Sequence, residues 1–369
     1  MQSSDKPVPP RWAPEHLDGI VPYAPGKPPE LLARERGIAD AIKLSANENP
    51  LGPSPAAVRA IHAAASEAHL YPDDNVYRLR QRLAQDLEVD PNELVFGHGS
   101  NELIDILART AVGPADHAVC GAPSFASYAL SLRAANVPFT QVPLRGRMYW
   151  ELDAVLEAVR PETRLIYVDN PNNPTSTHIP GDALRSFLQR VPAHVTVVID
   201  EAYIDFVDAP DFVSALSLRQ LRERLVILRT FSKAHGLAAL RVGYAVAPQP
   251  LVAYLNRVRL PFNANAIGQA AALASLDDQG HLTHGVRQNR VERARMIAGL
   301  RDLGLAPAPS QTNFLTVPFG AATANIHDGL LNAGLIVREL PPPIDDWLRI
   351  SIGLQSENDR LLAAVAQLL

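Results

Sequence analysis

The sequence RTFSKAHGLAALR, residues 229–241, directly follows the apolar run RLVIL of residues 224–228. An apolar, β-branched run of this length predicts a buried strand. Lys233 then lies just past the end of that strand, where open α/β sheets place their ligands. Ser232 precedes this lysine, and Arg241 follows it eight residues later. An amine between a hydroxyl and a guanidinium therefore indicates a ligand site at the end of this strand.

An amine that can condense with a carbonyl, next to two groups that can hold a phosphate, suits pyridoxal 5′-phosphate (PLP). In this interpretation the aldehyde of the cofactor would condense with Lys233, while Ser232 and Arg241 would bind its phosphate. The motif alone does not decide the matter, because most lysines in a chain are solvated surface charges. Neighbouring segments must therefore supply the rest of the site.

The overall composition disfavours several other classes of protein. With 369 residues and a net charge of −5, the chain is long enough for two lobes and has no basic surplus for nucleic acid or an anionic membrane. Cys120 is the only cysteine, which excludes an intramolecular disulfide framework and indicates a reducing compartment. No uninterrupted apolar stretch approaches about 18 residues, and the polar, proline-rich N-terminus is unlike a signal peptide. We therefore expect a soluble, cytoplasmic protein without a metal site.

A second candidate ligand site is the glycine-rich turn GHGSNE at residues 97–102. It lies between a short predicted strand, residues 93–96, and an apolar-faced predicted helix, residues 103–109. This order of strand, glycine turn and helix start points free backbone N–H groups at an anion. The glycines let the backbone approach a ligand closely, and Ser100 can add a hydroxyl. The turn lacks the P-loop lysine and the full dinucleotide fingerprint, so nucleotide binding is disfavoured.

Three more predicted strands end in side chains that suit a flat aromatic cofactor. Phe125 follows one of them and could stack on a ring, although core packing would explain it equally. Asn173, in the turn DNPNNPT, can donate to a phenolate-like oxygen. Asp200 ends the next strand and could pair with a protonated pyridine nitrogen, which would keep the ring an electron sink. Tyr203 could reach the ring hydroxyl.

Strands and helices alternate through the first two thirds of the chain, which predicts a mostly parallel sheet with helices on both faces. Beyond it, long helical segments and strands predicted at residues 312–317, 335–338 and 347–352 indicate a second, α+β lobe. Arg338 and Arg349 lie in or beside these strands. Their guanidinium groups match planar or tetrahedral anions, so each is either a ligand for an acidic group or an ordinary surface residue.

The N-terminal segment, residues 1 to about 45, is dense in prolines. We expect an arm laid over another surface rather than long regular structure. Tyr23 is the aromatic residue of interest there, and a packing anchor for the arm is the alternative. The following polar, Pro- and Gly-rich segment, residues 43–53, predicts a loop that contains Asn47. Tyr71 precedes a proline, which restricts its backbone and fixes its direction.

Taken together, these motifs resemble those of the fold-type I PLP aminotransferases, and more closely the histidinol-phosphate aminotransferases. The resemblance extends from about Val21 to the C-terminus. The motifs that carry it occur in the order of the family: NENP (47–50), YPD (71–73), GHGSNE (97–102), NPNNPT (170–175), DEAY (200–203), TFSK (230–233) and LRI (348–350). The resemblance implies an α/β fold, with a large domain around a mostly parallel seven-stranded sheet flanked by helices, and a smaller α+β domain. The boundaries we expect are 1–45 for an arm that joins the small domain, 46–265 for the large PLP-binding domain and 266–369 for the small domain.

Similarity to this family also implies the roles of individual residues. Lys233 would bind the cofactor covalently and carry the proton between the substrate and the cofactor. Asp200 would pair with the pyridinium nitrogen, with Asn173 and Tyr203 on the ring oxygen and Phe125 over the ring. The groups implied to hold the cofactor phosphate are Gly99, Ser100, Asn101, Ser232 and Arg241, with Tyr71 from the other subunit of a homodimer with shared active sites. Those implied to bind the substrate are Tyr23, Asn47, Asn173, Arg338 and Arg349.

The implied reaction converts imidazole-acetol phosphate and glutamate to histidinol phosphate and 2-oxoglutarate, in histidine biosynthesis. An aromatic amino-acid aminotransferase and a lyase resembling threonine-phosphate decarboxylase would use similar machinery. A non-catalytic binding module would be expected to lose Lys233 or Asp200. Two departures from the family pattern bear on the choice. Ser176 replaces a usual glycine, which asks only for a different turn, and the stiff segment RELPPP (338–343) replaces a loop often rich in Gly and Tyr. Glu339 in that segment could alter substrate preference.

Overall fold

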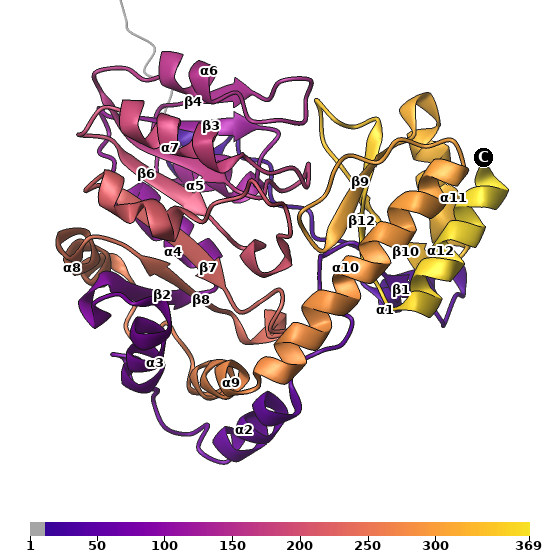
Figure 1. The fold of residues 1–369 in the computed structure, drawn as a ribbon, viewed down its shortest axis with the longest axis horizontal. Coiled ribbons are helices and arrows are strands. Elements are labelled where there is room, and N and C mark those ends of the chain that lie inside the picture. Colours follow the sequence, from indigo (N-terminus) through magenta and orange to yellow (C-terminus); the bar gives the residue numbers. More distant parts are fainter. Residues whose placement is uncertain (1–11) are drawn as a thin grey trace, which may run out of the picture.

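A seven-stranded sheet forms the centre of the larger of two units in the computed structural model, which describes residues 12–369 (Figure 1). β8 is antiparallel to both of its neighbours, and the remaining pairings are parallel. The predicted mostly parallel sheet is therefore confirmed. From one edge to the other the strands are β2 (Leu94–His98), β8 (Val242–Val246), β7 (Leu225–Thr230), β6 (Thr196–Asp200), β5 (Thr163–Asp169), β3 (His117–Ala122) and β4 (Phe139–Pro143).

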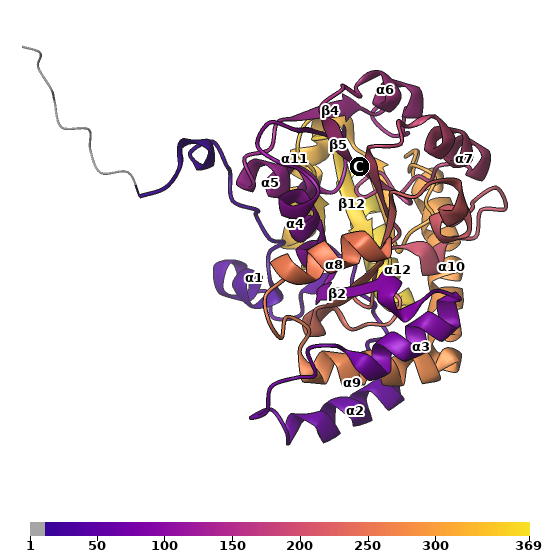
Figure 2. The ribbon, with the colours of Figure 1, turned by 90° about the vertical axis from the view of Figure 1, so that its left-hand side faces the viewer.

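Helices cover both faces of this sheet, which explains why its strands are apolar at successive positions. In β5, for example, Leu165 and Tyr167 belong to one apolar core, whereas Ile166 and Val168 belong to the core on the opposite face. The first face is covered by α4 (Ser100–Thr110), α5 (Ala126–Ala134) and α8 (Gln249–Val258). The second is covered by α3 (Tyr77–Leu87), α6 (Leu152–Glu157), α7 (Gly181–Arg190) and α9 (Ala266–Asp277), with α2 (Pro55–Ala65) packed on α9 (Figure 2).

The smaller unit contains a three-stranded antiparallel sheet in the order β11–β12–β9. Its strands are β9 (Phe314–Pro318), β11 (Arg338–Glu339) and β12 (Trp347–Ser351), and its helices are α10 (Gln279–Asp302), α11 (Thr323–Asn332) and α12 (Gln355–Leu368). Figure 1 shows α10 running between the two units. Short 3₁₀ helices occur at Glu15–Leu17, Pro91–Glu93, Ile204–Phe206, Ala215–Leu221, Ala238–Leu240 and Gly320–Ala322.

The prediction of a single strand at residues 335–338 is wrong, because the chain forms two short strands here and changes its pairing partner at Val337. β10 (Leu335–Ile336) pairs in parallel with β1 (Ile42–Lys43), whereas β11 pairs with β12. Val337 is buried in the apolar core of the smaller unit. Two different neighbours, one from each end of the chain, are available to the same apolar stretch, and its sequence does not distinguish them.

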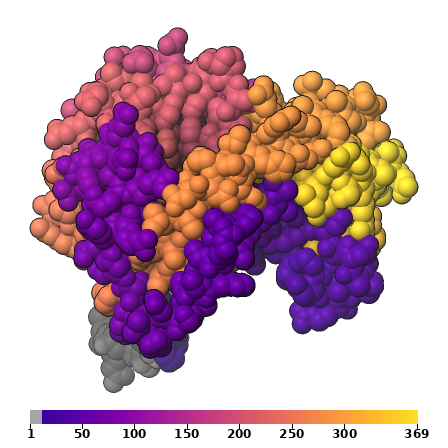
Figure 3. All heavy atoms as spheres, turned by 60° about the horizontal axis from the view of Figure 1, so that its bottom comes forward, coloured from indigo at the N-terminus to yellow at the C-terminus, as the bar shows by residue number. Residues whose placement is uncertain are grey.

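The N-terminal segment lies against the C-terminal part of the chain. Leu32 of α1 (Pro29–Arg36) is fully buried against Leu331 and Ile336. Figure 3 shows indigo atoms of this segment beside the yellow C-terminal residues. The first eleven residues of the predicted arm lie outside the described residues, and the three predicted domain boundaries stay a prediction. Within residues 12–369, no helix combines the length and the apolarity needed to span a bilayer.

Candidate active site

A cavity of about 530 Å³ lies at the carboxyl ends of β5, β6 and β7. Carboxyl ends of parallel strands converge on one edge of a sheet, so residues distant in sequence meet there. Most of the side chains singled out in the sequence line this cavity: Tyr23, Asn47, Ser100, Asn101, Phe125, Asn173, Asp200, Tyr203, Ser232, Lys233, Arg241 and Arg349. Gly99 lies next to its wall, whereas Tyr71 and Arg338 do not line it.

Lys233 follows β7 and lines the cavity. Its Nζ donates to the carbonyl of Ala46 at 3.2 Å and lies 5.8 Å from the centre of the Tyr203 ring. Burial, followed by the nearby positive charge of Arg349, lowers the pKa of Lys233 to about 8. The amine is therefore far more readily neutral, and so nucleophilic, than a solvated lysine.

Asp200 is the last residue of β6, and its carboxylate is almost fully buried. Oδ2 accepts a hydrogen bond of 2.9 Å from the Tyr128 hydroxyl, and Oδ1 accepts one of 3.0 Å from the Ala202 N–H. Burial is the largest influence on this group and raises the pKa of Asp200 to about 6. The carboxylate is thus costly to keep ionised unless a cationic group pairs with it.

Asn47 and Tyr203 form a contact across the cavity wall. The Asn47 amide donates to the Tyr203 hydroxyl at 2.9 Å, and Ser351 Oγ donates to Asn47 Oδ1 at 3.1 Å. Asn47 has a φ of 55°, a left-handed conformation that asparagine tolerates better than most residues. Burial raises the pKa of Tyr203 to about 12, so its hydroxyl stays protonated and can donate a hydrogen bond.

One end of the cavity is a cradle made largely of backbone. Gly99 has a φ of 73° and precedes the first turn of α4, whose N–H groups are free for a ligand. A Cβ atom at Gly99 would lie 2.4 Å from Nη2 of Arg241, and the left-handed φ at this position favours glycine as well. Arg241 Nη1 in turn donates to Ser232 Oγ at 3.3 Å. Backbone N–H groups, a hydroxyl and a guanidinium together match a phosphate.

The opposite end is formed by Arg349 of β12. Its Nη1 donates to Asn173 Oδ1 at 2.6 Å, and its Nη2 donates to the carbonyl of Ser45 at 2.8 Å. Its guanidinium carbon lies 5.4 Å from the centre of the Phe314 ring. Arg349 Nε and Ser45 Oγ are both buried without a hydrogen-bond partner. Each terminal nitrogen of Arg349 uses only one of its two N–H groups in the contacts with Asn173 and Ser45, so N–H donors remain for a polar or anionic ligand.

Arg338 lies farther out, in an adjoining cavity of about 750 Å³. The two cavities share the side chains of Tyr23, Phe125, Asn173 and Arg349 in their walls. The Arg338 guanidinium lies 5.4 Å from the centre of the Tyr23 ring, a cation–π contact that connects the arm to β11. Arg338 therefore flanks the outer side of the Arg349 end rather than the centre of the site.

A comparison with known families decides the class of this protein. The model of the family described as aminotransferase class I and II matches residues 39–365. The chain belongs to the class I and II aminotransferases. It is 41% identical to a histidinol-phosphate aminotransferase of Anaeromyxobacter sp., with 96% of this chain and 98% of the relative covered. A protein named histidinol-phosphate aminotransferase 2 from Pseudomonas aeruginosa is 42% identical, with 95% of each chain covered.

Solved structures agree with this assignment. The histidinol-phosphate aminotransferase of Sinorhizobium meliloti, solved in complex with PLP, superposes on this aminotransferase with a TM-score of 0.87 and 29% identity. The match covers 96% of both chains. The fold is therefore that of the fold-type I PLP enzymes, as the motifs predicted, and PLP is the cofactor of this aminotransferase.

The cavity of this aminotransferase fits PLP on its own geometry. The cradle around Gly99 has the donors for a phosphate, because the start of α4, Ser232 and the Arg241 guanidinium meet there. Asp200 supplies a buried carboxylate that needs a cationic partner, such as a protonated pyridine nitrogen. Lys233 lies in the same cavity, with an amine whose lowered pKa suits condensation with an aldehyde.

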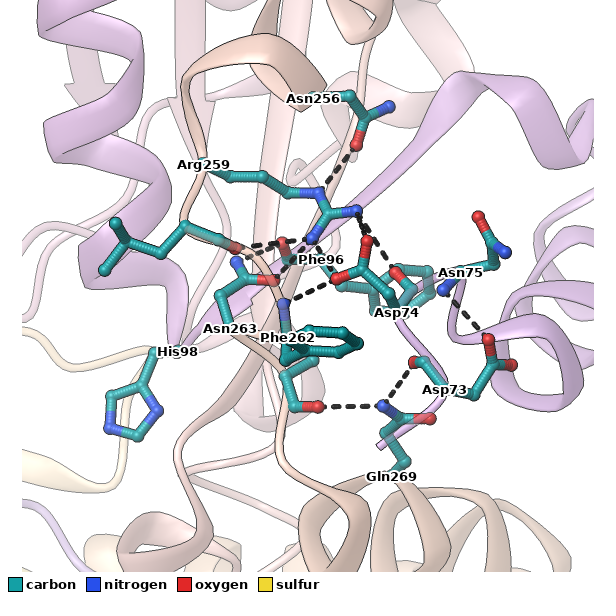
Figure 4. A network of polar contacts seen from close by, with 12 residues as sticks. Asp73, Asp74, Asn75, Phe96, His98, Asn256, Arg259, Phe262, Asn263 and Gln269 are labelled. Atoms are coloured by element: carbon teal, nitrogen blue, oxygen red, sulfur yellow. Dashed lines mark hydrogen bonds and ion pairs between the residues drawn. The ribbon is translucent and has the colours of Figure 1, made fainter. Parts of the chain in front are cut away.

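Tyr71 is the predicted cofactor ligand that the structure does not bring into the cavity. It is 82% exposed, and its ring stacks on Phe262 with 4.6 Å between ring centres. The loop that carries it is held by Arg259, which donates from Nη1 and Nη2 to the two carboxylate oxygens of Asp74 at 2.7 Å each (Figure 4). The Phe262 N–H donates to the same carboxylate at 2.6 Å. Tyr71 is thus presented outward from its own chain.

Three residues of the site were missed by the sequence analysis: Tyr128, Asp169 and Ser45. Tyr128 follows Phe125 by one helical turn, a spacing that could have indicated that both face the same cavity. Asp169 ends β5 just as Asp200 ends β6, and the two are register partners in adjacent strands. Both aspartates follow an apolar run in the sequence, and this shared pattern could have indicated Asp169 as well. Ser45 carried no such signal, because its contact with Arg349 joins opposite ends of the chain.

Proposed function

We propose that this aminotransferase exchanges the amino group of glutamate with imidazole-acetol phosphate, which yields histidinol phosphate and 2-oxoglutarate in histidine biosynthesis. The observation that carries the proposal is Arg349, which is half-buried, lines the cavity away from the cradle and keeps N–H donors beyond those that bind Asn173 and Ser45. A cavity with two cationic ends suits a phosphorylated cofactor and an acidic substrate together. The names of the relatives at 41–42% identity favour a substrate whose acidic end is a phosphate.

In this proposal the larger unit holds PLP. Asp200 would pair with the pyridine nitrogen, Asn173 and Tyr203 would donate to the ring oxygen, and Phe125 would cover the ring. The phosphate would be held by Gly99, Ser100, Asn101, Ser232 and Arg241. When bound, PLP supplies the electron sink that stabilises a carbanion at the substrate Cα.

The residues of the chain supply binding, orientation and proton transfer. Lys233 would hold the cofactor covalently between turnovers and, once released from it, accept the proton that leaves the substrate Cα. Its lowered pKa lets the amine serve as a base near neutral pH. Tyr128 would orient the Asp200 carboxylate through its hydrogen bond of 2.9 Å.

The acidic end of each substrate would be bound at the junction of the two cavities. Arg349 offers the terminal N–H donors that its contacts with Asn173 and Ser45 leave free, and Asn173 fixes the guanidinium. Tyr23 and Arg338 would close the outer side, and Asn47 would contact the substrate next to Tyr203. The same group must accept a phosphate in one half-reaction and a carboxylate in the other, which a guanidinium does readily.

We also propose a cytoplasmic homodimer with shared active sites. The support is the exposed, outward-facing Tyr71 ring, stacked on Phe262 beside a braced loop. In a dimer its hydroxyl would reach the cofactor phosphate of the other copy. Leu70 and Leu260, both more than half exposed, lie in the same two loops and would be buried by such contact.

An absorbance titration tests the substrate. Purified protein is loaded with PLP, and the band of the bound cofactor is followed as histidinol phosphate or phenylalanine is added. We expect histidinol phosphate to change the band at far lower concentration than phenylalanine, because a phosphate engages the guanidinium of Arg349. Lys233→Ala is the control, and it should bind PLP without turnover.

Other outcomes separate the alternatives. A preference for phenylalanine would assign the enzyme to aromatic amino acids, and release of carbon dioxide without a keto product would assign it to the lyases. Near-normal transamination by Lys233→Ala would contradict the assignment of the catalytic lysine.

A further inference from the structure

The carboxylate of Asp169 connects two loops of the cavity wall. Its Oδ1 accepts hydrogen bonds from Ser124 Oγ at 3.1 Å and from Asn172 Nδ2 at 2.7 Å. Its Oδ2 accepts from the Phe125 N–H at 3.3 Å and from the Asn173 N–H at 3.0 Å. Each oxygen therefore takes one bond from the loop after β3 and one from the loop after β5.

Asp169 occupies a rigid position in the wall. It ends the interior strand β5, is 3% exposed and is the register partner of Asp200. Its backbone carbonyl accepts a hydrogen bond of 3.0 Å from Trp150 Nε1. Because backbone and strand are both fixed, the carboxylate acts as a fixed point from which the two loops are held.

The four partners are all donors, and this requires a carboxylate rather than an amide. A carboxylate accepts at both oxygens, whereas an asparagine would turn an NH₂ group toward two of the four donors. Burial, the largest influence, raises the pKa of Asp169 to about 7, while the donors from Asn173, Asn172 and Ser124 favour the charged form. Hydrogen bonds to a charged, buried acceptor are stronger than neutral ones.

We propose that Asp169 is a positioning residue, whose carboxylate sets the separation between the Phe125 ring and the Asn173 amide and so the orientation of the bound cofactor ring. The inference rests on the proposed roles of Phe125 and Asn173. Asn173 also accepts the hydrogen bond of Arg349, so the same carboxylate indirectly aligns the substrate-binding guanidinium.

The test compares three variants of the full-length protein, with PLP as the probe. Asp169→Asn preserves size and replaces one of the two acceptor oxygens with an NH₂ group, and Ser124→Ala removes a single donor. Glu292→Gln is the matched control, because this carboxylate is 2% exposed and accepts from Arg295 and Asn358, but lies outside both cavities. The readouts are the dissociation constant of PLP, the circular dichroism of its bound absorbance band, kcat, KM and thermal stability.

We expect Asp169→Asn to bind PLP about tenfold more weakly, since two charge-assisted bonds are lost. The dichroic band should change in shape or intensity and kcat should fall, because the ring is no longer held in one orientation. Ser124→Ala should change the same band less. Glu292→Gln should lose thermal stability but keep the wild-type band and PLP affinity.

Wild-type affinity and an unchanged dichroic band in Asp169→Asn would overturn the proposal. If Asp169→Asn does not fold, Ser124→Ala decides, and an unchanged band in that variant would overturn it too. Failure of the proposed function gives a different result, because the wild-type protein would then bind PLP with its dichroic band but would not respond to histidinol phosphate.

Discussion

The two ends of the cavity are built in different ways. The cradle around Gly99, Ser232 and Arg241 belongs to the larger unit and consists of strand ends, a helix start and close backbone contacts. The end around Arg349 combines side chains from the N-terminal segment, the larger unit and the smaller sheet. The first is fixed once the larger unit has folded, whereas the second depends on how the two units meet. Substrate preference can therefore change in this architecture while cofactor binding stays the same.

The largest expected effect comes from removing the cationic group of the cradle, which tests whether the cradle binds the cofactor independently of the Arg349 end. We expect Arg241→Ala to weaken PLP binding about 100-fold, because a charge-assisted contact with a partly desolvated phosphate is lost. Measuring the dissociation constant of PLP by fluorescence or absorbance checks this. Arg349→Ala, which removes the guanidinium at the other end of the cavity, should leave the dissociation constant of PLP within about threefold of wild type. Equal losses in both variants would show that the two ends are not independent.

The reciprocal change should affect the substrate instead. We expect Arg349→Ala to raise KM for histidinol phosphate about 20-fold, since truncation removes the half-buried charge that would face the phosphate. Steady-state kinetics at saturating PLP measures it. Arg349→Lys keeps a charge but loses the planar fork, so an intermediate KM is expected. A fall in kcat with an unchanged KM would instead place Arg349 in proton transfer or orientation.

A smaller effect is expected on the pKa of Lys233, because, in addition to burial, the positive charges at both ends of the cavity, Arg349 and Arg241, lower it. Because the neutral amine is the reactive form, we expect the rate at which the cofactor-free protein captures PLP covalently to rise with pH and to level off above about pH 8, the pKa of this lysine. Removing a nearby positive charge favours the ammonium form, so Arg349→Gln should raise this pKa and move the profile to higher pH. The charge of Arg241 has a smaller influence, so Arg241→Gln should move it less. A shift to lower pH in either variant would contradict this electrostatic account.

The cradle and the strand-end residues were accessible from sequence because each is tied to a short local pattern. An apolar run followed by a polar side chain indicates a strand end, and parallel strands bring such ends together. Asp200, Asn173 and Lys233 were recognisable for that reason. Asp169 follows the same pattern, but its position before a proline-rich turn made it look like part of the turn rather than the anchor of two loops.

Contacts across the chain were not accessible in the same way. The hydrogen bond from Tyr128 to Asp200 depends on how α5 is rotated over the sheet, which the weakly amphipathic sequence of this helix does not fix. The partner of β10 is equally hidden, because a two-residue strand carries too little pattern to specify a neighbour. Ser176 has a φ of 66°, a conformation that glycine adopts more readily than serine; its place where the family pattern usually has glycine was a hint of this.

Because β1 pairs with β10, part of the substrate end can fold only late in translation. Ile42 and Lys43 leave the ribosome early, yet their partners Leu335 and Ile336 are made only after almost the whole chain. The seven strands of the large sheet are all synthesised before that point. The loop with Asn47 and the carbonyl of Ser45 can therefore take their final places only when translation is nearly finished. A ribosome stalled before residue 335 would carry a chain with a complete large sheet but an unfinished substrate end.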